Sequence, residues 1–121
     1  MKNWLINSPS CLGKLQELYL FYGELESLCN LKKHLIISGK VQGVGYRYWL
    51  QSLSTKLNVQ GWVRNLKTGE VEAVVIGEEK IIQEIINHCK SGPANSLVEK
   101  VQISDTNEEH NKNYFEIYPT E

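Results

Sequence analysis

Aspartate and cysteine are scarce in this sequence of 121 residues, and their scarcity excludes two kinds of phosphate chemistry. The single aspartate, Asp105, excludes a mechanism that phosphorylates one of a pair of aspartates. None of the three cysteines is followed six residues later by arginine, which excludes a Cys-x5-Arg phosphate loop. Because the cysteines are odd in number, widely spaced and without a C-x-x-C pair, they argue against a disulfide framework and fit a reducing compartment.

Long apolar runs and an excess of charge of one sign are also missing. No run approaches the roughly 18 apolar residues that span a bilayer. The formal net charge of −1 gives no overall positive field for nucleic acid or an anionic membrane. Residues 7–9, Asn-Ser-Pro, interrupt the early apolar stretch, so a signal peptide is not expected. We therefore expect a cytoplasmic protein without nucleic-acid or membrane partners.

The histidines offer no sign of a metal centre. His34, His88 and His110 lie far apart and have no ligand-like spacing with carboxylates. The sequence therefore predicts no metal site and no cofactor.

The chain divides near Lys32–Lys33 into an extension, residues 1–32, and one domain, residues 33–121. In the extension, Ser10 could cap a helix whose apolar residues recur every three or four positions as far as Cys29. The alternative is a loosely ordered tail.

Short strand and helix patterns alternate in the second part. We expect strands at 34–41, 59–65, 71–77, 98–104 and 114–118 and helices at 47–57 and 78–90, with a hairpin turn at 66–69. The order βαββαβ, with one further strand, predicts an α+β ferredoxin-like sandwich: an antiparallel sheet with two helices on one face. Many unrelated functions use this fold, so the fold alone decides none.

A glycine-bearing loop, residues 39–45, follows the first expected strand and opens a helix. It is not a Walker loop, because Lys40 is followed by Val41 and not by the serine or threonine that such a loop needs. It is not a dinucleotide-binding motif either, because Tyr48 stands at the position of the third glycine. Such a loop can turn backbone N–H groups inward to bind an anion at the positive end of the helix. Arg47, one of only two arginines, adds a planar fork for two phosphate oxygens. The alternative is a tight connection with a solvated arginine.

Two long motifs stand out, at residues 39–47 and at residues 61–71. Residues 39–47, G-K-V-Q-G-V-G-Y-R, resemble the first acylphosphatase signature, G-x-V-Q-G-V-G-[FY]-R, at every specified position. Residues 61–71, G-W-V-R-N-L-K-T-G-E-V, are similar to the second, and 92–94 and 115–117 resemble later landmarks. The resemblance covers residues 33–118.

The resemblance implies a hydrolase that cleaves acyl phosphates to a carboxylate and inorganic phosphate, without a metal or a phosphoenzyme. It assigns Arg47 and Asn65 as catalytic residues, and Asn65 would orient a water for in-line attack. The implied phosphate ligands are the guanidinium of Arg47 and the backbone N–H groups of Gln42, Gly43, Val44, Gly45 and Tyr46. We expect the chain to be a monomer.

Other residues in and near the two motifs have expected structural roles. Trp62 is expected to pack, and Arg64 to point away from the site if its strand neighbour Asn65 points in. Asn58 ends the first helix where the family usually has glycine, and asparagine tolerates the left-handed conformation next best. The extension could cover the sheet face opposite the helices, at Ile36, Val74 and Ile76.

Two rival functions share this fold or loop. An RNA-recognition motif needs aromatic residues on a central strand, but residues 71–75 contain none and include Glu72. A non-catalytic anion-binding module would keep the loop without turnover, and activity on acetyl phosphate separates it from an enzyme. An acylphosphatase-like domain that acts on carbamoyl phosphate is a closer alternative. The sequence does not identify the acyl group of the substrate.

Overall fold

The computed structural model describes residues 30–121, and the helix expected between Ser10 and Cys29 lies outside them. Every element expected in the second part is present, although the first strand begins earlier than predicted. The strands are β1 (Asn30–Lys40), β2 (Gln60–Asn65), β3 (Val71–Glu78), β4 (Leu97–Asp105) and β5 (Phe115–Ile117), and the helices are α3 (Tyr46–Lys56) and α4 (Glu79–Ser91). Within the described residues no helix is long and apolar enough to cross a membrane.

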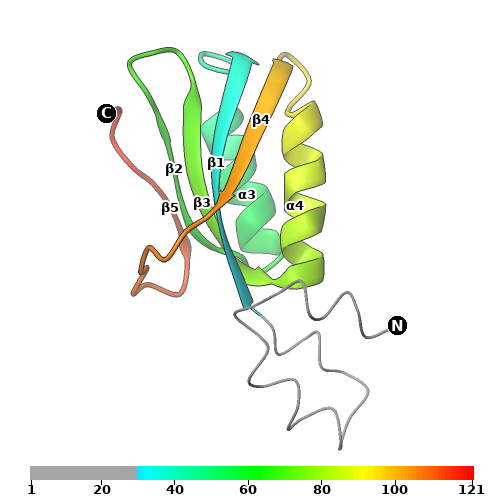
Figure 1. The fold of residues 1–121 in the computed structure, drawn as a ribbon. Coiled ribbons are helices and arrows are strands. Elements are labelled where there is room, and N and C mark those ends of the chain that lie inside the picture. The colour runs from blue at the N-terminus through cyan, green and yellow to red at the C-terminus, as the bar shows by residue number, and fades with distance from the viewer. Residues whose placement is uncertain (1–29) are drawn as a thin grey trace, which may run out of the picture.

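The five strands form one sheet in the order β4-β1-β3-β2-β5, and both helices cover the same face of it (Figure 1). The first four strands pair antiparallel, as predicted. The prediction of a wholly antiparallel sheet is wrong for β5, which pairs parallel with β2. Because β4 ends at the end of the sheet where β2 begins, the loop that follows brings β5 in beside β2 in the same direction.

The main core lies between the sheet and the helices. Along each strand the side chains point alternately to the two faces of the sheet, and those on the helix side form one layer of this core. Leu35 and Ile37 are fully buried on β1, while their neighbours Ile36 and Ser38 face the other side. On α4, the side chains of Ile82, Ile85, Ile86 and Cys89 are buried in this core, and Ile81 packs against it partly buried. Burial raises the pKa of the Cys89 thiol to about 11, which fits a small apolar residue of the core.

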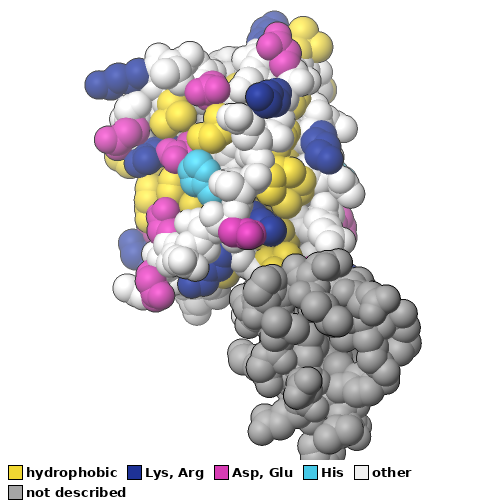
Figure 2. All heavy atoms as spheres, in the orientation of Figure 1, with side chains coloured by type: hydrophobic (Ala, Val, Ile, Leu, Met, Phe, Trp, Pro, Cys, Tyr) yellow, Lys and Arg dark blue, Asp and Glu magenta, His cyan; other side chains and the backbone are white. Residues whose placement is uncertain are grey.

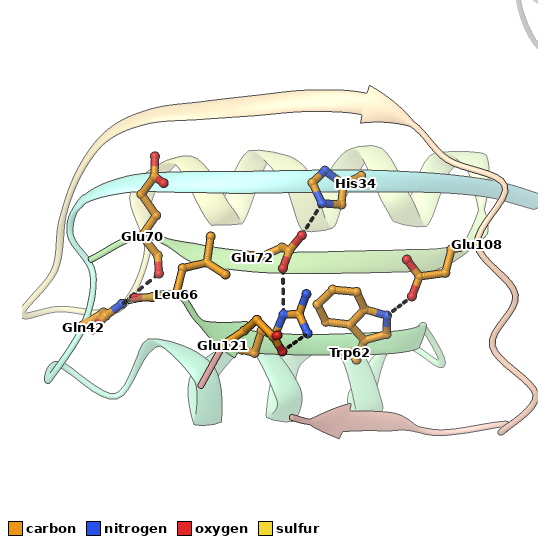
Figure 3. Close-up of polar contacts among 9 residues, drawn as sticks. His34, Gln42, Trp62, Leu66, Glu70, Glu72, Glu108 and Glu121 are labelled. Carbon is orange, nitrogen blue, oxygen red and sulfur yellow. Dashed lines mark hydrogen bonds and ion pairs between the residues drawn. The ribbon is translucent and has the colours of Figure 1, made fainter. Parts of the chain in front are cut away.

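The helix-free face of the sheet carries its own smaller cluster, formed by Trp62, Val74 and Ile76 with Tyr118 packed against them. Trp62 is 3% exposed, stacks on Tyr118 with ring centroids 5.1 Å apart, and donates from Nε1 to Glu108 at 2.7 Å (Figure 3). The expected packing role of Trp62 is confirmed. Any cover from the extension lies outside the described residues.

Beside that cluster, the polar side chains of His34, Arg64 and Glu72 from three strands make a network on the same face. Arg64 Nε donates to Glu72 Oε1 at 2.7 Å, and His34 Nε2 lies 2.7 Å from Glu72 Oε2 (Figure 3). Figure 2 shows this face as a mixture of apolar side chains and charges of both signs. Burial alone would raise the pKa of Glu72, but the hydrogen bonds from His34 and Arg64 outweigh it and hold that pKa below its ordinary value of 4.5.

Gly61 of β2 is the position where a side chain would be least tolerated. Its φ is +134°, and a Cβ atom there would lie 1.9 Å from the carbonyl oxygen of Val74 on the neighbouring strand. We expect Gly61→Ala to lower the free energy of unfolding by more than roughly 3 kcal/mol, because strain and a backbone clash combine. Gly69→Ala is the control: its φ of +100° is also unfavourable, but a Cβ would meet nothing within 4 Å. It should cost only about 1–2 kcal/mol. Urea denaturation measures both, and equal losses would contradict the steric argument.

Glu72 should make the stability of the protein depend on pH in the acid range. Since its pKa is lower in the folded state, the ionised carboxylate stabilises the fold above the ordinary pKa, and this contribution is lost as the pH falls through the lowered value. We expect Glu72→Gln to be less stable than wild type at pH 7 and to lose less stability on acidification below pH 4.5. Glu99 is an exposed carboxylate on β4, so Glu99→Gln is the control. Its free energy of unfolding, measured with urea at each pH, should change with pH as that of wild type does.

Candidate active site

The predicted phosphate loop connects the end of β1 to the first turn of α3, at the same end of the sheet as the β2–β3 hairpin (Figure 1). Gly43 and Gly45 have φ values of +74° and +81°, which L side chains rarely adopt. A Cβ atom at either position would meet nothing within 4 Å. The glycines are therefore needed for their backbone conformation, and the space beside them, where a side chain would begin, is open.

Side chains on the other positions of the loop anchor it to the core. Val44 packs against the main core cluster, and Tyr46 is 1% exposed within it. The Tyr46 hydroxyl donates to the carbonyl oxygen of Cys89 at 2.8 Å, and burial raises the pKa of this phenol. The Tyr46 ring also meets the edge of Trp49. Of Tyr46, only the backbone N–H is left to face an anion.

The backbone N–H groups of residues 42–48 donate no hydrogen bond to any other residue in the described part of the chain. The first bond into the helix runs from Trp49 N to the carbonyl oxygen of Gly45, at 2.9 Å. Gly45 caps the helix without a side-chain hydrogen bond, and the first turn has no acidic residue. Consecutive free N–H groups at the positive end of a helix are suited to bind an anion.

Arg47 and Arg64, the two arginines, have opposite surroundings. Arg64 is paired with Glu72 and Glu121, and its Cζ lies 4.8 Å from the centre of the Trp62 ring. Arg47, half-buried in the first turn of α3, has no carboxylate partner within residues 30–121, and its Cζ lies 6.0 Å from the centre of the Tyr48 ring. Its guanidinium is therefore available to bind two oxygens of an anion.

Asn65, the last residue of β2, faces the helix side of the sheet. Val63, two residues earlier, is fully buried in the main core, whereas Arg64 between them lies on the helix-free face, as expected from strand alternation. The side-chain oxygen Oδ1 of Asn65 is buried and has no hydrogen-bond partner among the described residues. A buried acceptor without a partner is costly in a fold, and a bound water or ligand would satisfy it.

The backbone of Asn65 is held on both sides. It pairs with Val71 of β3, and its carbonyl oxygen accepts from the N–H of Glu121 at 3.0 Å. The carbonyl oxygen of Glu121 in turn accepts from the N–H of Lys67 at 3.0 Å. This support from residues after β5 has no signal in the sequence motifs.

The side chain of Gln42 links the loop to the hairpin beyond Asn65. Its Nε2 donates to the carbonyl oxygens of Leu66 and Glu70, each at 2.8 Å (Figure 3). The family resemblance implied a role only for the backbone N–H of Gln42, so the side-chain contacts were not predicted. Within residues 30–121, no three His, Cys, Asp or Glu side chains gather in a metal-like group.

Comparisons with known proteins agree with the motifs. The acylphosphatase family model matches residues 33–117. An acylphosphatase of Rhodopseudomonas palustris is 48% identical over 69 residues, which are 57% of this chain and 70% of that protein. The crystal structure of the acylphosphatase from Bacillus subtilis superposes with a TM-score of 0.69 at 32% identity, over 73% of this chain and 98% of that one. Full-length HypF, in its phosphate- and nucleotide-bound form, gives a TM-score of 0.67 at 30% identity, over 75% of this chain but 12% of its own.

The contrast between the arginines predicts which of them binds phosphate. Arg47→Met should weaken binding of inorganic phosphate by roughly 10- to 100-fold, because charge-assisted hydrogen bonds are lost. Arg64→Met is the matched control and should bind phosphate as wild type does, since its guanidinium lies on the opposite face. Isothermal titration with phosphate measures both affinities. An unchanged affinity in Arg47→Met, or an equal loss in the two variants, would contradict the assignment.

Proposed function

The chain belongs to the acylphosphatase family, and we propose that it hydrolyses the carboxyl-phosphate bond of acyl phosphates to a carboxylate and inorganic phosphate. One observation carries the proposal: the unpaired, buried Oδ1 of Asn65 lies at the same end of the sheet as a loop of unpaired N–H groups. The first group can accept a hydrogen bond from a water, and the second can hold a phosphate.

In the proposed complex, the phosphoryl oxygens bind to the backbone N–H groups of Gln42, Gly43, Val44, Gly45 and Tyr46 and to the guanidinium of Arg47. The open space outside Gly43 and Gly45 and the absence of a competing carboxylate beside Arg47 in the described residues support this assignment. Such preorganised donors stabilise the charge that spreads over the phosphoryl oxygens in the transition state.

Asn65 then orients the nucleophile. Its Oδ1 accepts a hydrogen bond from a water O–H, which turns a lone pair of the water oxygen toward phosphorus. A bond forms between that oxygen and phosphorus while the bond from phosphorus to the acyl oxygen breaks, and the carboxylate leaves with the electron pair. The attacking water must lose a proton, and an asparagine amide cannot accept it. The proton therefore passes to a phosphoryl oxygen. A carboxylate is a good leaving group, so positioning and charge stabilisation suffice.

We propose no metal and no cofactor for this reaction, since the loop and Arg47 supply the positive potential that a cation would otherwise provide. The proposed partner is a small acyl phosphate, with inorganic phosphate as product. We propose a monomeric enzyme that acts without nucleic acid or a membrane surface. We also propose a cytoplasmic location, because the odd number and wide spacing of the cysteines fit a reducing compartment.

Hydrolysis of benzoyl phosphate in EDTA tests the proposal. Wild type should turn over without added metal, and in oxygen-18 water the label should appear in phosphate. Asn65→Ala should lower kcat by roughly 100- to 1,000-fold, the loss typical of one preorganised group at a transition state, with less change in phosphate affinity.

Asn113→Ala, an exposed asparagine in the loop before β5, is the control and should keep wild-type kcat. Near-normal turnover in Asn65→Ala would overturn the role of that residue. A folded wild type that binds phosphate without turnover would instead identify a non-catalytic anion-binding module.

A further inference from the structure

We propose that the Gln42 side chain is a positioning residue, which fixes Asn65 relative to the phosphate by tying the phosphate loop to the β2–β3 hairpin. The inference rests on the proposed function, because it assumes that Asn65 orients the attacking water. It assigns to the side chain of Gln42 a role separate from that of its backbone N–H.

The geometry of the contact is specific to an amide of this length. Nε2 carries two hydrogens, and both are used, one for the carbonyl oxygen of Leu66 and one for that of Glu70, at 2.8 Å each. These acceptors lie far from Gln42 in the sequence, so no local turn explains the contacts. The amide therefore joins two segments that the chain connects only through α3 and β2.

The two acceptors flank Asn65 and the residue paired with it. Asn65 lies opposite Val71 in the β2–β3 ladder, Leu66 follows Asn65, and Glu70 precedes Val71. Leu66 N also donates to the Glu70 carbonyl oxygen at 2.9 Å, which closes the hairpin. Gln42 thus holds the rung immediately beyond Asn65, and a shift of that rung would move the Asn65 amide relative to the loop.

The Glu70 side chain strengthens the same junction. Its Oε2 accepts from the Ser38 hydroxyl of β1 at 3.1 Å, and its Oε1 accepts from the Thr68 hydroxyl at 3.0 Å. The hairpin is therefore tied to β1 just before the loop and to Gln42 within it. Since in-line attack needs the water and the phosphorus at a fixed separation, this junction sets the distance on which catalysis depends.

A double-mutant cycle on benzoyl phosphate hydrolysis separates positioning from simple stabilisation. Gln42→Met keeps the length of the side chain and the backbone N–H but removes both donors. It should lower kcat roughly 10-fold or more while the inhibition constant of inorganic phosphate changes less than about 3-fold. In the Asn65→Ala background the same substitution should cost less than about 2-fold, because the group it positions is already gone.

Gln51→Met is the matched control. Gln51 also donates from Nε2 to a backbone carbonyl oxygen, that of Phe115 at 3.2 Å, but it lies in α3 away from the hairpin. It should keep wild-type kcat. Gln42→Asn, whose amide is too short to reach both carbonyl oxygens, should give an intermediate loss and replaces Gln42→Met in the cycle if that variant does not fold.

The outcomes distinguish the inference from the proposed function. Wild-type kcat in Gln42→Met, or an equal loss in both backgrounds, would overturn the positioning role while leaving Asn65 as the catalytic residue. A loss confined to the inhibition constant of phosphate would also overturn it, because Gln42 would then act on the loop alone. No turnover in folded wild type would overturn the proposed function and this inference with it.

Discussion

The hydrogen bond from the Tyr46 hydroxyl to the Cys89 carbonyl oxygen joins the first turn of α3 to the last turn of α4, inside the main core. It fixes where α3 begins, because the residue that opens the helix cannot rotate outward without leaving a buried hydroxyl unpaired. The loop before it then has little freedom, since Val44 is also packed inward and both glycines hold left-handed backbone conformations. The free N–H groups follow from this anchoring: a loop held by its side chains does not need its own backbone hydrogen bonds to keep its shape.

Much of the fold and the centre of the site could be predicted from the sequence because their signals are local. The periodicity of the chain predicted the strands and helices of residues 33–121, and Asn58 has the expected left-handed φ of 60°. The glycine loop and Asn65 were found by motifs of consecutive residues. What the sequence could not predict depends on contacts between distant segments. The direction of β5 depends on where β4 ends, and the Gln42 and His34 contacts span 24 and 38 residues of chain.

The two faces of β2 have separate tasks. Val63 and Asn65 face the helices, with Val63 in the main core and Asn65 in the candidate site. Trp62 and Arg64 face the other side, where Trp62 belongs to the smaller cluster and Arg64 pairs with Glu72. The sheet lies between the site and this pair, so the carboxylates that compensate Arg64 are kept from Arg47. Glu72 and Glu121, which pair with Arg64, therefore do not compete for Arg47, and Arg47 has no carboxylate partner in the described residues.

The same division has an evolutionary consequence. A lineage that adapts to more acidic surroundings can change His34, Glu72 or Arg64 on the helix-free face, and the phosphate loop on the other side of the sheet need not change with them. An insertion in β2 would have a larger effect. One extra residue before Arg64 would exchange the faces of Arg64 and Asn65, which would place the guanidinium of Arg64 in the site and the amide of Asn65 outside it. Tolerance to substitution on one face therefore coexists with intolerance to a one-residue change in the length of β2.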